Sequence, residues 1–299
     1  MHYCNFERGV IWHMKTTGSR IQNQTDNPAG LAGPEPPAPN CRATFQSIAR
    51  SCINLIRNQR KAVIAADPEA IHSMRIELTR LRAAVLFFSS MTDDDAWPGI
   101  NKELRWLNAA LGKARDHDVT AHYARRKRYR RWAKSSRRAM LRAQRKVDRR
   151  LSQKLASARY VRLMAAVHHW IAGGPWLETN RSLGSESINA FAPARLQAWR
   201  EAISREGRHI RILHRKQLHR LRIRCKHYRY VVAALHSLGV TLTRQDLKFA
   251  EIAKQVHGAL GDLRDLKRLR RAAKKRPPGY RESKRRLLQQ AEKPFRRAP

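Results

Sequence analysis

Apolar residues recur with a helical period along most of the chain, and two stretches show this period best. In the first stretch an apolar side chain returns every three or four residues, at Ile71, Met74, Leu78, Leu81, Val85 and Phe88. The second stretch repeats the spacing at Leu218, Leu221, Cys225, Tyr228, Val232 and Leu235. At about 100° per residue each set lies on one arc of a helix. Each stretch is therefore predicted to be a helix with a core-facing stripe.

The same period predicts an all-α fold, because no stretch alternates between apolar and polar residues as a strand does. Asp67 and Pro68 provide an N-cap and a first-turn proline for one helix, and Gly239 provides a stop signal for another. The predicted helices cover approximately residues 42–63, 68–91, 104–119, 125–155 after a short basic break, 160–171, 194–205, 218–238, 242–275 and 281–290.

The first 40 residues lack this period, and residues 27–40 are rich in proline, glycine and alanine. We predict a disordered tail over residues 1–40, followed by a folded region over residues 41–299. Residues 177–187 are interpreted as a linker between an amino-terminal half (about 41–176) and a carboxy-terminal half (about 188–299).

Basic residues and a histidine follow one edge of each apolar stripe. In the first helix these edge positions are His72, Arg75, Thr79 and Arg82, with Arg80 beside them. In the second helix they are His219, Arg222, Lys226 and Arg229, about 147 residues later. Guanidinium forks and ammonium groups suit phosphate oxygens, so cations at the margin of a core predict a groove that binds phosphate. The competing interpretation is a solvated helix flank with weak surface ion pairs.

A second motif follows each basic helix, as Leu111-Gly-Lys-Ala-Arg-Asp116 and as Leu260-Gly-Asp-Leu-Arg-Asp265. Two motifs that each occur twice in the same order predict an internal duplication. Arg115 and Arg264 are candidate anion ligands. The candidate orienting carboxylates are Asp116, Asp118, Asp262 and Asp265. Plain intramolecular ion pairing, with the glycine allowing helices to approach, is the alternative. A metal site is not predicted, because such a site needs several oxygen ligands on one ion.

Taken together, these motifs resemble the CHAD domain (conserved histidine α-helical domain), over roughly residues 42–290. The resemblance implies two four-helix bundles related by a pseudo-twofold axis, with a basic cavity or channel between them. It also implies binding of inorganic polyphosphate. One position departs from the family pattern, since Thr79 stands where the family usually carries a basic residue.

The net charge and the composition indicate which class of partner the chain binds. The formal net charge is +40 and 42% of the residues are hydrophobic, so a sizeable core and a polyanionic partner are both expected. Nucleic acid is the main competing partner, because phosphate contacts dominate affinity for any such polymer. The low aromatic share, 7%, and the lack of a recognised nucleic-acid-binding motif weigh against it. The basic run over residues 125–150 is a candidate for a second, looser polyanion surface.

No catalytic motif is evident, so we predict a binding protein rather than an enzyme, without cofactor or metal. The four cysteines form no regular framework and no apolar run is long enough to span a bilayer, which favours a cytoplasmic location, with polyphosphate granules as one expected place. His72 and His219 are predicted to bind phosphate most strongly when protonated. Affinity should then weaken as pH rises through the histidine range. The competing role for these two histidines is structural hydrogen bonding.

Overall fold

The computed structural model describes residues 39–296, and every regular element within them is a helix, as predicted. The residues of the predicted tail up to 38, and residues 297–299, lie outside this described part. The α-helices are α1 (Cys41–Asn58), α2 (Arg60–Ile64), α3 (Pro68–Phe87), α4 (Ser89–Thr92), α5 (Trp97–Arg125), α6 (Lys127–Arg130), α7 (Arg137–Ala156), α8 (Ala158–Gly173), α9 (Trp176–Thr179), α10 (Arg181–Ser185), α11 (Ile188–Gly207), α12 (Arg215–Ser237), α13 (Arg244–Ala272) and α14 (Tyr280–Arg296), and the 3-10 helix is η1 (Lys134–Ser136).

Local sequence signals set the ends of the two basic helices, α3 and α12. The Asp67 carboxylate accepts a hydrogen bond from the Glu69 backbone N–H at 2.9 Å, and Pro68 occupies the first turn of α3. After the C-terminal end of α12, Gly239 adopts a φ of 73°, a conformation that glycine reaches without steric cost. Both predicted signals are confirmed.

Tertiary contacts override local signals between residues 177 and 193. The predicted linker contains α9 and α10, and α11 begins at Ile188 instead of near residue 194, with Pro193 inside it. The Ser187 side chain caps this earlier start, and the Ile188 backbone N–H donates to the Pro39 carbonyl at 3.1 Å. Ile188 is fully buried, so burial of the first turn stabilises a helix that the proline alone would not predict.

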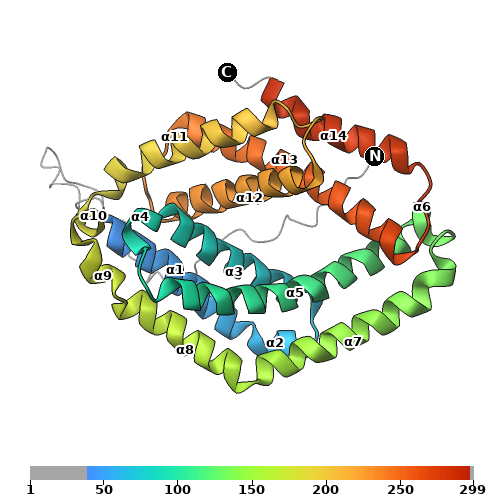
Figure 1. Cartoon of the computed structure of the whole chain (residues 1–299), viewed down its shortest axis with the longest axis horizontal. Coiled ribbons are helices and arrows are strands. Elements are labelled where there is room, and N and C mark those ends of the chain that lie inside the picture. The colour runs from blue at the N-terminus through green and yellow to red at the C-terminus, as the bar shows by residue number, and fades with distance from the viewer. Residues whose placement is uncertain (1–38, 297–299) are drawn as a thin grey trace, which may run out of the picture. The chain divides into compact units, whose positions relative to one another are not determined.

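The two predicted apolar stripes lie in one continuous hydrophobic core. Every stripe residue of α3 is buried, and the α12 stripe is buried from Leu221 onward. Aromatic rings join α1, α3 and α11: Phe88 of the α3 C-cap stacks on Phe191 at 5.7 Å and meets Phe45 edge-on at the same distance. Figure 1 shows α3 beside α12 near the middle of this arrangement, and α5 also packs on α13.

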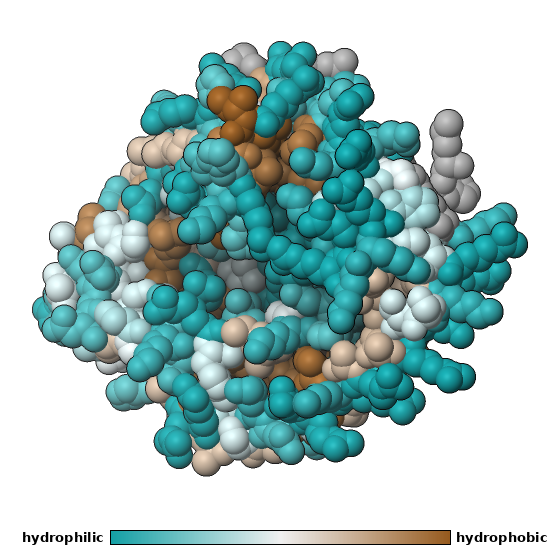
Figure 2. All heavy atoms as spheres, turned by 45° about the vertical axis from the view of Figure 1, so that its right-hand side comes forward, coloured by the Kyte–Doolittle hydropathy of each residue, from teal (hydrophilic) through white to brown (hydrophobic). Residues whose placement is uncertain are grey.

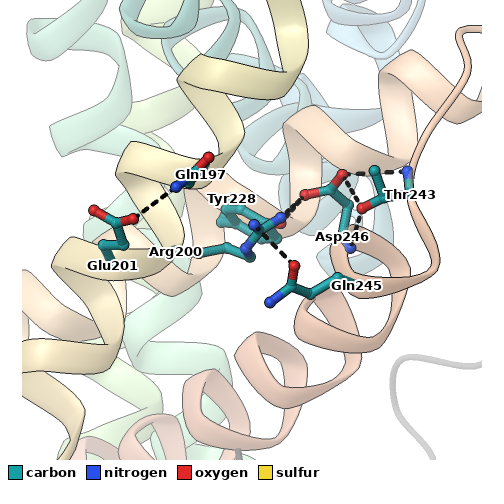
Figure 3. A network of polar contacts seen from close by, with 7 residues as sticks. All are labelled: Gln197, Arg200, Glu201, Tyr228, Thr243, Gln245 and Asp246. Atoms are coloured by element: carbon teal, nitrogen blue, oxygen red, sulfur yellow. Dashed lines mark hydrogen bonds and ion pairs between the residues drawn. The ribbon is translucent and has the colours of Figure 1, made fainter. Parts of the chain in front are cut away.

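Two carboxylates fix the starts of α5 and α13, the helices that carry the Leu-Gly motifs. Asp94 accepts hydrogen bonds from the Trp97 backbone N–H and the Trp170 indole, both at 2.8 Å. Asp246 is ion-paired with Arg200 and accepts from the Tyr228 hydroxyl at 3.1 Å, as Figure 3 shows. These contacts tie the start of each long helix to neighbouring helices and so fix where the motif side chains lie.

The basic run over residues 125–150 begins with the predicted break. α6 and η1 fill that break, and a second, smaller apolar cluster including Tyr129 and Leu269 packs them on the end of α13. α7 then carries the exposed arginines along the surface. Figure 2 shows that hydrophilic residues cover most of the face that it presents.

The cysteines and the lengths of the apolar helices complete this description. Cys41, Cys52 and Cys225 are free and buried, which fits small apolar roles. Within residues 39–296, no helix is both long and apolar enough to cross a bilayer.

Candidate anion-binding site

The edge rows of α3 and α12 face each other. The Lys226 ammonium donates a hydrogen bond to the Thr79 hydroxyl at 3.0 Å, and this hydroxyl donates to the Arg75 carbonyl at 2.9 Å. Lys226 is only 8% exposed although it carries a charge. The two rows predicted from the sequence therefore meet at one helix contact.

The two Leu-Gly helices bring further charges to the same place. Asp116 of α5 forms ion pairs with two α13 residues, Arg264 at 3.6 Å and Arg268. Arg268 also pairs with Asp265 of its own helix at 3.3 Å. Burial lowers the pKa of Arg75 against the opposing charge of Asp116, and the charges of Arg264 and Arg268 lower it further, which places the α13 arginines close to α3.

We call six cations the inner basic cluster: Arg75, Arg222, Lys226, Arg229, Arg264 and Arg268. They come from α3, α12 and α13, and the carboxylates of Asp116 and Asp265 lie among them. Burial raises the pKa of Asp265, against the opposing effect of Arg268. Six cations against two carboxylates leave an excess of positive charge in a partly dehydrated place, where an anion is favoured.

Arg75 and Arg222 hold the corresponding position of the two predicted repeats. Burial lowers the pKa of Arg222 to about 10, with Arg264 and Arg75 adding to the effect. In both arginines the guanidinium Nε is buried, and it has no hydrogen-bond partner among the described residues. A buried donor without a partner costs about 1–3 kcal/mol, so each is a ready contact for a phosphate oxygen.

Arg80, also predicted as a ligand, is engaged in a buried ion pair. Its guanidinium lies 2.8 Å from the carboxylate of Glu77, which is 4% exposed. The guanidinium carbon of Arg80 lies 5.5 Å from the ring centre of Tyr230, and the Lys226 ammonium lies 5.3 Å from it. Arg80 is therefore ion-paired with Glu77 and lies beside the same ring as Lys226.

Arg82 lies farther along α3, close to Arg105 of α5. Burial and then the charge of Arg105 on α5 lower its pKa. His227 of α12 is close by, and burial together with Lys226 and Arg82 lowers the pKa of His227 to about 4. Arg82 is thus placed to extend the inner basic cluster along the α3–α12 contact.

The two predicted histidines differ in burial. His72 is half-buried, and His219 is exposed at the start of α12. Burial and then Arg264 and Arg222 lower the pKa of His219 below its ordinary value of 6.5. The expected pH response of binding therefore moves to more acidic pH than the sequence suggests.

The two Leu-Gly motifs differ in how they use their arginines. Arg264 joins the inner basic cluster, whereas the charge of half-buried Arg115 acts on Asp118 and His122. The motif glycines are not required for close packing. A Cβ on Gly261 would meet Arg222 Nη2 at 3.5 Å, an ordinary contact, and one on Gly112 would meet nothing within 4 Å.

The candidate orienting carboxylates Asp118 and Asp262 each accept a hydrogen bond from a neutral side chain. Asp118 accepts a 2.5 Å hydrogen bond from Gln144 of α7, and burial, then the nearby Asp148, raises its pKa to about 6. Asp262 accepts from the Tyr123 hydroxyl at 2.8 Å. Within residues 39–296, no three His, Cys, Asp or Glu side chains are grouped so as to hold a metal ion.

Sequence reasoning missed two members of this region, Arg268 and His257 of α13. Burial lowers the pKa of His257, and the charges of Arg222, Arg229, Lys226 and Arg75 lower it further. A signal was present, because His257, Gly261, Arg264 and Arg268 are spaced by four, three and four residues. That spacing puts them on one face of a helix.

Comparison with known proteins agrees with the all-helical fold. The crystal structure of the CHAD domain from the plant Ricinus communis is similar, with a TM-score of 0.70 and 22% sequence identity, over 90% of this chain and 96% of that one. PptA from Streptomyces chartreusis shares the fold at a TM-score of 0.56 and 14% identity, over 88% of this chain and 96% of that one. A search of curated proteins gives no match. The CHAD domain sequence profile matches residues 47–293, and the chain therefore belongs to the CHAD domain family.

Proposed function

We propose that this protein binds inorganic polyphosphate through the inner basic cluster. The observation that carries the proposal is the pair formed by Arg75 and Arg222, each with a buried Nε that lacks a hydrogen-bond partner in the described part of the chain. Both lie in a cluster with more cations than carboxylates. Phosphate oxygens would satisfy the two donors and offset the excess charge.

A linear polyanion fits this cluster better than a single phosphate. The cations come from three helices and continue along α3 to Arg82. A chain of phosphates could contact successive turns, with Arg115, His72 and His219 as outer ligands. The basic cavity or channel between two duplicated bundles, implied by the resemblance, is part of this proposal.

The carboxylates are proposed to orient the arginines. Asp116 contacts both Arg264 and Arg268, and Asp265 contacts Arg268, so their charges hold the guanidinium groups in fixed positions. Fixed ligands lose less conformational entropy on binding. In the cell, we propose that binding targets the protein to, or scaffolds it at, polyphosphate granules in the cytoplasm.

Nucleic acid is the second candidate ligand, and one observation favours it. Between residues 125 and 150, Asp148 is the one acidic residue, and most of the arginines there are exposed. Such a face attracts any phosphate polymer through its charge. This surface does not require the buried donors of the inner basic cluster.

A competition assay separates the two candidates. Labelled long-chain polyphosphate is bound to the full chain at physiological salt and challenged with unlabelled polyphosphate, duplex DNA, single-stranded RNA and free phosphate. We expect unlabelled polyphosphate to displace the label at much lower phosphate concentration than either nucleic acid. Equal displacement by duplex DNA would overturn the proposal in favour of a generic basic surface. Unchanged polyphosphate chain length after incubation is the result expected for binding without turnover.

A further inference from the structure

A buried histidine at the centre of the inner basic cluster has no assigned role. His257 lies on α13 with 6% of its surface exposed. Both of its ring nitrogens are buried, and neither has a hydrogen-bond partner among the described residues. A polar side chain in this state costs free energy unless something satisfies it, so it calls for an explanation.

The surroundings of His257 decide its protonation state. Arg222, Lys226 and Arg229 face it from α12, and Arg75 faces it from α3. Burial acts first and these charges act next, and together they hold the pKa of His257 well below 6.5. The ring is therefore neutral at neutral pH, with one N–H donor and one nitrogen acceptor.

A neutral hydrogen-bond donor at His257 has an advantage over another cation. Another cation among four would raise the cost of the empty cluster, because like charges repel strongly where water is excluded. A neutral imidazole adds a directional N–H without adding charge. Its acceptor nitrogen can in turn take a hydrogen bond from a neighbouring cationic side chain.

We propose that His257 is a further ligand-binding residue, which donates a charge-neutral hydrogen bond to a phosphate oxygen held by Arg75 and Arg222. This inference rests on the proposed binding of polyphosphate. It differs from the roles of the arginines in one measurable respect, because His257 contributes to affinity without contributing to the salt dependence of binding. The number of cations that contact a polyanion sets the slope of log affinity against log salt, and an uncharged contact leaves it unchanged.

The test measures polyphosphate affinity across a salt series for wild type and three substitutions at this position. His257→Leu removes the hydrogen bond and should weaken binding about 10-fold or more at every salt concentration, with an unchanged slope. Asn mimics Nδ1 and Gln mimics Nε2, so His257→Asn and His257→Gln report which nitrogen donates. One of the two should bind more tightly than His257→Leu.

Two controls keep the outcomes distinct. His169→Leu changes an exposed histidine on α8 and should leave affinity unchanged. The unfolding temperature of His257→Leu should match or exceed that of wild type, since the substitution removes a buried polar group that has no partner among the described residues. If His257→Leu does not fold, the Asn and Gln variants carry the same comparison.

Wild-type affinity in the His257→Leu protein would overturn the inference and leave polyphosphate binding intact. A reduced salt slope in that protein would overturn it as well, because His257 would then act as a charge. Failure of the wild-type chain to bind polyphosphate would instead overturn the proposed function.

Discussion

Lys226 and Thr79 are 147 residues apart, and the Lys226 ammonium donates a 3.0 Å hydrogen bond to the Thr79 hydroxyl. The same separation relates the two predicted repeats, so the two residues hold the corresponding position in each. Where the family pattern would place a basic residue on α3, this chain has Thr79, and its hydroxyl accepts the hydrogen bond from Lys226. This substitution lets the two basic helices meet without two cations in contact.

Replacing Thr79 by lysine should therefore destabilise the empty protein. Thr79→Lys would place two ammonium groups together in a largely buried contact, and we expect a loss of about 1–3 kcal/mol in the free energy of unfolding. Saturating polyphosphate should recover most of the loss, because it neutralises the added charge. Thermal unfolding with and without polyphosphate measures both effects. Thr79→Val, which loses the hydrogen bond but adds no charge, is the control and should show no extra recovery.

Each inner arginine should also contribute to the salt dependence of binding. Arg222→Gln removes one half-buried cation whose buried Nε has no partner among the described residues, so polyphosphate affinity should fall about 10-fold or more. The slope of log affinity against log salt should fall by about one contact. A titration over a range of salt concentrations measures both quantities. An unchanged slope would show that Arg222 does not contact the polymer.

The carboxylate network at the start of α13 makes a prediction about stability alone. Asp246 is buried and holds Arg200 and the Tyr228 hydroxyl (Figure 3). Asp246→Asn leaves Arg200 without its counter-charge, and we expect a loss of about 3 kcal/mol in unfolding free energy. Chemical denaturation measures this loss. Exposed Asp262→Asn should cost much less, and equal losses would contradict the account of the network.

Asp118 predicts a pH dependence of stability. Burial and Asp148 raise its pKa from 3.8 to about 6 in the folded protein, so the folded state holds this proton more tightly than the unfolded state does. Stability contributed by protonated Asp118 is present at low pH and is lost as pH rises between about 4 and 6. Asp118→Asn should therefore raise the unfolding temperature at pH 7.5 and flatten its decline over that window. Exposed Asp95→Asn is the control, and an equal decline in wild type and Asp118→Asn would contradict the assignment.

Helix positions were largely predictable because they follow from local periodicity and caps. The apolar stripe of α3 and the end of α12 at Gly239 both depend on residues that are close together in the sequence. The early start of α11 was not, because contacts with the chain at Pro39 stabilise a turn that precedes Pro193. Non-local hydrogen bonds leave no periodic signal in the sequence.

The candidate site was predictable only where its residues share a helix edge. Arg75 and Arg222 follow from that rule, whereas the ion pair that engages Arg80 depends on how deeply Glu77 is buried. The hydrogen bond that Asp118 accepts from Gln144 could not be predicted, because it depends on how α7 packs on α5. His257 was overlooked because spacing alone cannot show that both of its nitrogens are buried, with no partner in the part of the chain that the structure describes.

For polyphosphate binding, charge in the inner basic cluster should matter more than charge elsewhere on this protein. Polyphosphate affinity at fixed physiological salt should be compared between Arg75→Gln/Arg222→Gln and Arg142→Gln/Arg145→Gln, which removes the same charge from exposed positions on α7. We predict at least a 100-fold loss for the inner pair, at about 10-fold for each charge-assisted contact, and a loss below about 10-fold for the outer pair. Equal losses in the two variants would contradict the claim.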